Sequence, residues 1–216
     1  MKQFSVYLDD LHAIYILDPK NKFNFQFFQD KPKEIYIHHT GNNSHSLEEA
    51  YNIGISRFNQ PSYHFIIDRK GSIYQTLPIN VAGAHVRRHN ENSFGIALLD
   101  LISPSSPTLA MKYSLGALID FLKSNYPIEK VSTHVEATVS DVNEIIEQTR
   151  IKQDLPLLDI NEIGELTLSN VEKYKENVKK EIKYSDVDKI VKDLLNQRVE
   201  YVKNCPGPYF KDLLDL

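Results

Sequence analysis

Two histidines and one cysteine have the residue types and the positions that a catalytic metal site requires. His38 lies near the end of the segment EIYIHH, and His134 ends the segment KVSTH; both segments are typical of β-strands. Side chains at strand ends in an α/β sheet converge on one cleft. Cys205, the single cysteine of the chain, lies in a Cys-Pro-Gly-Pro turn and offers a thiolate. Two imidazoles and one thiolate leave a fourth position open, as catalytic zinc sites do.

The spacing of these three residues does not by itself select a metal site. A histidine is more often a core or surface residue than a ligand. Cys205 could instead act with His134 as a thiol nucleophile, or it could be buried filler. From the residues alone, all of these alternatives stay open.

The segments that must position these residues alternate between strand and helix. Strands are expected at 34–39, 63–67, 72–77, 94–100 and 130–134. Ser46 and Glu49 form a capping box for a helix over 46–59, and residues 109–125 have the spacing of an amphipathic helix. Asp68-Arg69-Lys70-Gly71 joins the second and third strands as a hairpin. We therefore expect an α/β fold with a central mixed β-sheet flanked by helices.

The composition changes after residue 137. Residues 138–200 are rich in lysine and glutamate with helical spacing, which predicts a helical insertion before the C-terminal loop that carries Cys205. The aromatic-rich residues 1–32 are expected to form an N-terminal extension, and residues 33–216 a catalytic domain that includes the insertion. A solvated helical face is the default interpretation of residues 138–200, and an unidentified protein partner is the alternative.

Charge and hydropathy exclude several classes of protein. The 216 residues carry 25 basic and 29 acidic side chains, a net charge of −4, which does not favour a nucleic-acid binder. No segment approaches the roughly 18 apolar residues of a membrane span, and the first residues lack the pattern of a signal peptide. We expect synthesis as a soluble cytoplasmic protein without a disulfide.

Five blocks of sequence, in their order, resemble the zinc-dependent N-acetylmuramoyl-L-alanine amidases of the type-2 amidase family. The blocks are IYIHHT, SYHFIIDRKGSIYQ, AGAHVRRHNENSFGIAL, STHVE and KNCPGPYF. The family includes phage lysozyme-amidases and peptidoglycan recognition proteins, and the resemblance covers roughly residues 33–137 and 201–214. It implies hydrolysis of the amide bond between N-acetylmuramic acid and L-alanine in peptidoglycan. The cell wall or recycled wall fragments would then be the place of action, reached by a route that the sequence does not identify.

The resemblance assigns the metal ligands. It implies that one zinc ion is bound by His38, His134 and Cys205, which match the three ligand positions of the family. About 60 residues more than the family usually has separate His134 from Cys205. Ala97 stands where some bacterial members have a glutamate, and phage-type members lack that acid too.

The resemblance also implies catalytic and substrate-binding residues. Tyr63 matches the catalytic tyrosine before His-Phe and would orient the attacking water or the intermediate. Lys203 matches the lysine that would stabilise the oxyanion. His85 and Asn92 match residues that bind the substrate. Ordinary sheet packing for Tyr63 and a solvated loop position for Lys203 are the competing interpretations.

For four other histidines, the expected roles are less specific. His39 and His64 are on the strand faces opposite to His38 and Tyr63. We expect that His39 is not a metal ligand and that His64 has a structural role. His45 and His89 lie in polar segments and either line the cleft or are exposed. A different function is also open: a recognition module that binds muropeptides without cutting them. Members of that branch lack the cysteine ligand, whereas this chain has Cys205.

Overall fold

The computed structural model describes residues 3–7, 13–17, 23–41, 46–99, 107–152, 171–184, 189–202 and 205. These residues form two compact units. The first contains the described residues before His134 together with Cys205, and the second runs from His134 to Val202.

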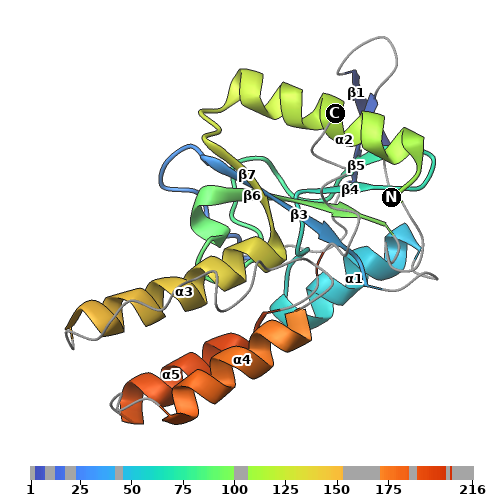
Figure 1. Ribbon diagram of the computed structural model, residues 1–216. Coiled ribbons are helices and arrows are strands. Elements are labelled where there is room, and N and C mark those ends of the chain that lie inside the picture. The colour runs from blue at the N-terminus through green and yellow to red at the C-terminus, as the bar shows by residue number, and fades with distance from the viewer. Residues whose placement is uncertain are drawn as a thin grey trace. The chain divides into compact units, whose positions relative to one another are not determined.

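The first unit contains a mixed sheet of seven strands (Figure 1). The strands are β1 (Gln3–Tyr7), β2 (Ala13–Leu17), β3 (Glu34–His39), β4 (Phe65–Ile67), β5 (Ile73–Gln75), β6 (Ser93–Leu98) and β7 (Lys130–Thr133). Their order across the sheet is β1-β2-β5-β4-β6-β3-β7. The pairs β1–β2 and β4–β5 are antiparallel, and the other neighbours are parallel. The mixed sheet and the hairpin are therefore confirmed.

Two helices cover the sheet, α1 (Leu47–Phe58) and α2 (Leu109–Asn125), on opposite faces (Figure 1). The predicted capping box begins α1: Ser46 Oγ accepts from the backbone N–H of Glu49 at 3.2 Å, and Glu49 Oε2 accepts from the backbone N–H of Ser46 at 2.8 Å. Thr108 caps α2 through the backbone N–H of Met111. The expected α/β fold is confirmed.

The central strands are buried on both faces. Every residue of β6 is buried, and in β3 the residues between Glu34 and His39 are buried as well. This explains their nearly continuous apolar sequence, because a strand covered on both sides needs apolar side chains in both directions. His38 is a polar residue in this buried part of β3, and only 1% of its surface is exposed.

Several boundaries differ from the expectation. The strand expected at 63–67 begins at Phe65, so Tyr63 and His64 precede it. The strand expected at 94–100 is Ser93–Leu98, and β7 ends at Thr133, so His134 begins a helix. Strands β1 and β2 belong to the sheet, where β2 pairs with β5. The boundary at residue 32 and the limits of the catalytic domain stay a prediction.

The second unit is helical and confirms the helical insertion. It consists of α3 (His134–Lys152), α4 (Val171–Tyr184) and α5 (Lys189–Glu200). It has an apolar core of its own, made of Val135, Val139, Val142, Val171, Tyr174, Val178, Ile182, Leu195, Val199 and Val202. Searched over the described ranges, none of the helices combines the length and the apolarity that crossing a membrane requires.

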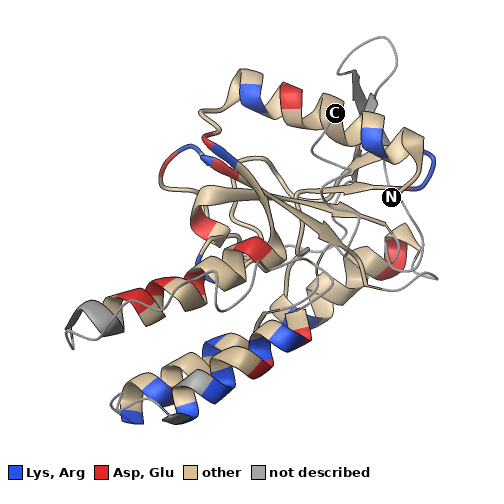
Figure 2. Cartoon of the chain, in the orientation of Figure 1, with Lys and Arg blue, Asp and Glu red and all other residues tan. Residues whose placement is uncertain are grey.

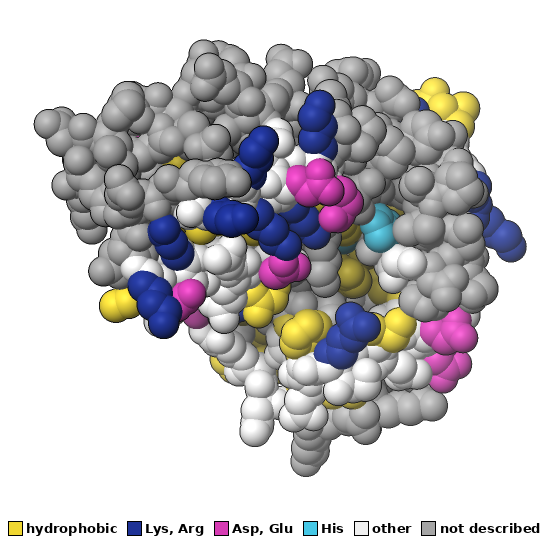
Figure 3. All heavy atoms as spheres, turned by 60° about the horizontal axis from the view of Figure 1, so that its bottom comes forward, with side chains coloured by type: hydrophobic (Ala, Val, Ile, Leu, Met, Phe, Trp, Pro, Cys, Tyr) yellow, Lys and Arg dark blue, Asp and Glu magenta, His cyan; other side chains and the backbone are white. Residues whose placement is uncertain are grey.

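Charges of both signs cover the described surface. Within the second unit, acidic side chains predominate on α3, and basic side chains predominate on α4 and α5 (Figure 2). On the face shown in Figure 3, acidic side chains lie among the lysine and arginine side chains. Such mixed charge is typical of a solvated surface.

Candidate metal centre

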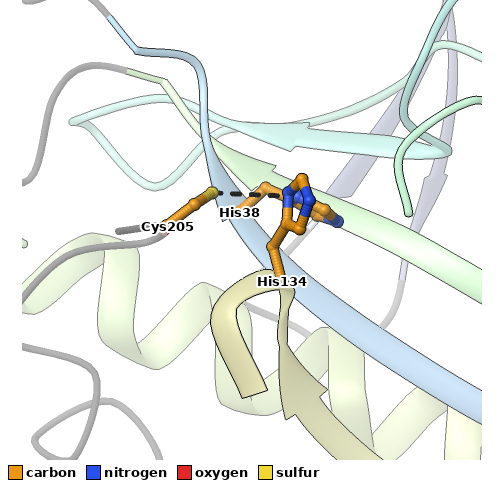
Figure 4. Close-up of side chains that lie close together, drawn as sticks. All are labelled: His38, His134 and Cys205. Carbon is orange, nitrogen blue, oxygen red and sulfur yellow. Dashed lines mark hydrogen bonds between the residues drawn. The ribbon is translucent and has the colours of Figure 1, made fainter. Parts of the chain in front are cut away.

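The fold brings together the three residues that the sequence suggested as ligands. One ligand atom each from His38, His134 and Cys205 lies within 4.8 Å of the other two (Figure 4). The sheet register explains the two histidines: Ile37 of β3 pairs with Thr133 of β7, so the residue after each lies at the same end of two neighbouring parallel strands. Their side chains meet because the carboxyl ends of parallel strands share one edge.

The geometry of the cysteine and the first histidine fits a zinc ion. Cys205 Sγ lies 3.8 Å from His38 Nδ1, and both residues are buried. Zinc bonds of about 2.3 Å to sulfur and about 2.0 Å to nitrogen, at a tetrahedral angle, would place these atoms about 3.5 Å apart. A thiolate with imidazoles is a donor set that zinc prefers, and three ligands leave one position for a reactant.

The strand that carries His38 also supports the cysteine. The backbone N–H of His39 donates to Cys205 Sγ at 3.4 Å. Such a donor stabilises the negative charge of a thiolate and fixes the position of the sulfur. The end of β3 therefore supplies one ligand and holds a second one.

Tyr63 lies beside the cluster. Its ring centroid is 5.1 Å from that of His38. Burial raises the pKa of the Tyr63 hydroxyl above its usual value, and the charge of the Cys205 thiolate raises it further. The hydroxyl therefore keeps its proton at neutral pH and can donate a hydrogen bond. Tyr63 also packs against the apolar cluster of Ala50, Ile66 and Ala97, so the packing role proposed for it is present as well.

The other residues assigned by the sequence are distributed differently. His85 is buried, and its Nδ1 lies 3.2 Å from His38 Nε2. Asn92 ends a short 3-10 helix (Asn90–Asn92) and is exposed, so its substrate role stays a prediction. Lys203 lies outside the described residues. The sequence did not single out Asn90, whose Oδ1 accepts from the backbone N–H groups of His85 and Val86, both at 2.9 Å.

His64 is anchored at both ring nitrogens, as a structural histidine should be. Its Nδ1 accepts from the backbone N–H of Gly95 at 3.0 Å, and its Nε2 lies 2.8 Å from the carbonyl oxygen of Val81, to which it donates. The ring is fully buried, and burial lowers the pKa of His64 to about 4. A second proton could bind only at Nδ1, and it would break the hydrogen bond that Nδ1 accepts from Gly95.

We expect acid to destabilise the fold through His64. The unfolded chain binds a proton below its ordinary pKa of 6.5, whereas the folded chain does not until about pH 4. Stability from this group is therefore complete above pH 6.5 and is lost as the pH falls toward 4, by about 3 kcal/mol at most. Urea unfolding from pH 4.5 to 7.5, with a chelator present so that metal release does not contribute, measures the effect.

The comparison variant is His64→Gln, which cannot take up that proton. Its free energy of unfolding should fall less steeply between pH 6.5 and 4.5 than that of the wild type. Parallel pH profiles for the two proteins would contradict the assignment.

The fold and the cluster define an α/β protein with a candidate metal centre at the carboxyl ends of β3 and β7. Residues 28–153 match the family model described as N-acetylmuramoyl-L-alanine amidase. The chain belongs to this family, as the sequence resemblance implied.

Solved structures agree with this assignment. One is the endolysine N-acetylmuramoyl-L-alanine amidase LysCS from Clostridium intestinale URNW, which is 28% identical; the match covers 56% of this chain and 80% of that one, with a TM-score of 0.53. The N-acetylmuramoyl-L-alanine amidase LysC from the same organism is also 28% identical, covering 55% of this chain and 81% of that one, with a TM-score of 0.50. Among curated proteins, none matches the chain.

Proposed function

We propose that this protein is a zinc-dependent amidase that hydrolyses the bond between N-acetylmuramic acid and L-alanine in peptidoglycan. The observation that most directly supports this proposal is the cluster of His38, His134 and Cys205, whose three donors leave one coordination position open. Membership of the amidase family supports the bond, and the two similar N-acetylmuramoyl-L-alanine amidases support the class of substrate.

The ligand set determines what a metal could do here. Bound by two neutral imidazoles and one thiolate, zinc would polarise a carbonyl and lower the pKa of water toward neutrality. His38 and Cys205 are buried, so their donors are shielded from competing water. The backbone N–H of His39 helps to keep Cys205 as a thiolate.

Two further residues would act on the substrate. The Tyr63 hydroxyl, which keeps its proton, would donate to the attacking water or to the oxygen of the tetrahedral intermediate; it is a poor base. Lys203, two residues before the cysteine in the chain, would stabilise the developing oxyanion with its fixed positive charge. The family resemblance assigns the substrate contacts to His85 and Asn92, and of these two residues Asn92 is the exposed one.

The test is cleavage of a soluble N-acetylmuramoyl-peptide, followed by mass spectrometry of the products. The expected products are the free lactyl carboxylate and a peptide with a free L-alanine amine. Activity should disappear after removal of metal by a chelator and return with zinc. Activity that survives chelation would instead indicate a thiol nucleophile, and binding without cleavage would indicate a recognition module.

Assays with intact cell walls and with soluble fragments distinguish the two proposed places of action, the cell wall and recycled wall fragments. Faster hydrolysis of intact sacculi would support the wall, and activity restricted to soluble muropeptides would support recycled fragments. That residues 138–200 bind an unidentified protein partner remains a proposal.

A further inference from the structure

The buried contact between two imidazoles carries an inference about how the metal ligand is oriented. We propose that His85 is a positioning residue for His38: it fixes the proton of His38 on Nε2, so that Nδ1 is the nitrogen that binds metal. This inference rests on the proposed function, because it concerns the same ligand set.

Each ring nitrogen of His38 has a different neighbour. Nδ1 lies 3.8 Å from Cys205 Sγ, on the side of the candidate metal, and Nε2 lies 3.2 Å from His85 Nδ1. A neutral imidazole carries its proton on one nitrogen only. With Nδ1 bound to metal, the proton lies on Nε2 and is donated to His85 Nδ1, which must then be an acceptor. An outer hydrogen bond of this kind fixes the tautomer and the ring orientation of a metal-bound histidine.

The sheet makes room for the ring of His85. In the register of β3 and β6, Gly95 pairs with Tyr36 and Ala97 pairs with His38. A Cβ atom at Gly95 would lie 2.6 Å from Cγ of His85. The ring therefore occupies the space that a side chain at residue 95 would fill. This explains in physical terms the glycine of the segment NSFGI.

Two further contacts hold His85 in place, one to its ring and one to its backbone. A Cβ atom at Gly83 would lie 2.7 Å from Cδ2 of His85, so this residue too must be small. Asn90 Oδ1 accepts from the backbone N–H of His85. Because the ring is packed and the backbone is hydrogen-bonded, the position of Nδ1 is determined by the fold rather than by the metal.

The burial of His85 distinguishes this role from that of a substrate contact. The residue is 7% exposed, which leaves little of its surface for a substrate. A residue that contacts substrate should affect KM and leave metal affinity unchanged, whereas a positioning residue should change metal affinity itself. Metal affinity therefore separates the two roles without any measurement of catalysis.

The experiment compares zinc affinity, measured by competition with a chromophoric chelator, in the full-length wild type, His85→Leu and His85→Asn. Leucine removes the acceptor, and we expect about 10- to 100-fold weaker binding. Asparagine can place an oxygen near the position of Nδ1, so its affinity should lie between those of the other two proteins. His89→Asn is the matched control: His89 interacts with Tyr36, and its replacement should leave zinc affinity unchanged.

The outcomes test the inference separately from the proposed function. Failure of the wild type to bind zinc would overturn the proposed function. Zinc binding by the wild type with equal affinity in His85→Leu would overturn only the positioning role, as would an asparagine variant no better than leucine. Circular dichroism of the metal-free proteins checks folding, and His85→Ala replaces the leucine variant if that one does not fold. The visible spectrum of bound Co²⁺ should also change in the leucine or alanine variant and not in His89→Asn.

Discussion

Replacement of Cys205 with serine is expected to lower both zinc affinity and amidase activity by more than about 100-fold, the upper end of what loss of an outer partner costs. The serine hydroxyl does not ionise near neutral pH, so the site would lose its only negative ligand. The backbone N–H of His39 would also face a neutral oxygen instead of a thiolate sulfur. Metal content of the purified protein and steady-state hydrolysis of an N-acetylmuramoyl-peptide measure the two effects.

A second substitution at the same position is the control. Aspartate is also a zinc ligand, so Cys205→Asp should retain more zinc than Cys205→Ser. This order would show that the position requires an anionic donor and not merely a residue of similar size. Full hydrolysis by the serine variant would contradict a role for the thiolate in the metal site.

The strand ends were predictable from the sequence because they depend on local pattern. Alternating apolar residues predicted the strands that end near His38 and His134, and the end of a strand in such a sheet points to a site. The exact start of α3 was not predictable, since β7 and α3 follow one another without a loop. The alternating pattern also predicted a strand that begins at Tyr63, two residues before β4 begins at Phe65.

Long-range contacts account for what the sequence left open. Nothing local to Cys205 indicates that its sulfur faces the end of β3, 166 residues away along the chain. The same holds for Asn90, whose role arises from the backbone N–H groups that it reaches in the folded loop, while the family resemblance drew attention to Asn92. Tertiary packing determines such contacts, and the resemblance rather than the spacing made the ligand set predictable.

Gly95→Ala is expected to damage both the stability of the fold and the metal site. A Cβ atom there would lie 2.6 Å from Cγ, 2.7 Å from Cδ2 and 2.9 Å from Nδ1 of His85, which is too close for any of these atoms. Either the ring or the strand must move, and overpacking of this kind costs about 1–3 kcal/mol. Displacement of Nδ1 would also weaken the contact with His38, so zinc affinity should fall by about 10- to 100-fold. Urea unfolding and zinc competition measure the two losses.

Gly116→Ala is the matched control. A Cβ atom at this position, within α2, meets no atom within 4 Å apart from its chain neighbours and the backbone of its own helix. The same substitution there should stabilise the protein by about 0.5–1 kcal/mol, since alanine is the better helix former. Unchanged stability and zinc affinity in Gly95→Ala would contradict the close packing of the His85 ring.

The double variant Gly95→Ala/His85→Ala identifies the cause of the destabilisation. If the new methyl group collides with the imidazole, removal of the ring should relieve most of the cost, and Gly95→Ala should destabilise the His85→Ala protein less than the wild type. If the cost instead came from the strand backbone, the two substitutions would be additive. Zinc affinity should behave in the same way, because in the absence of the ring there is no outer partner left to displace from His38. A coupling in both quantities would link the glycine of a strand to the orientation of a metal ligand that it does not touch.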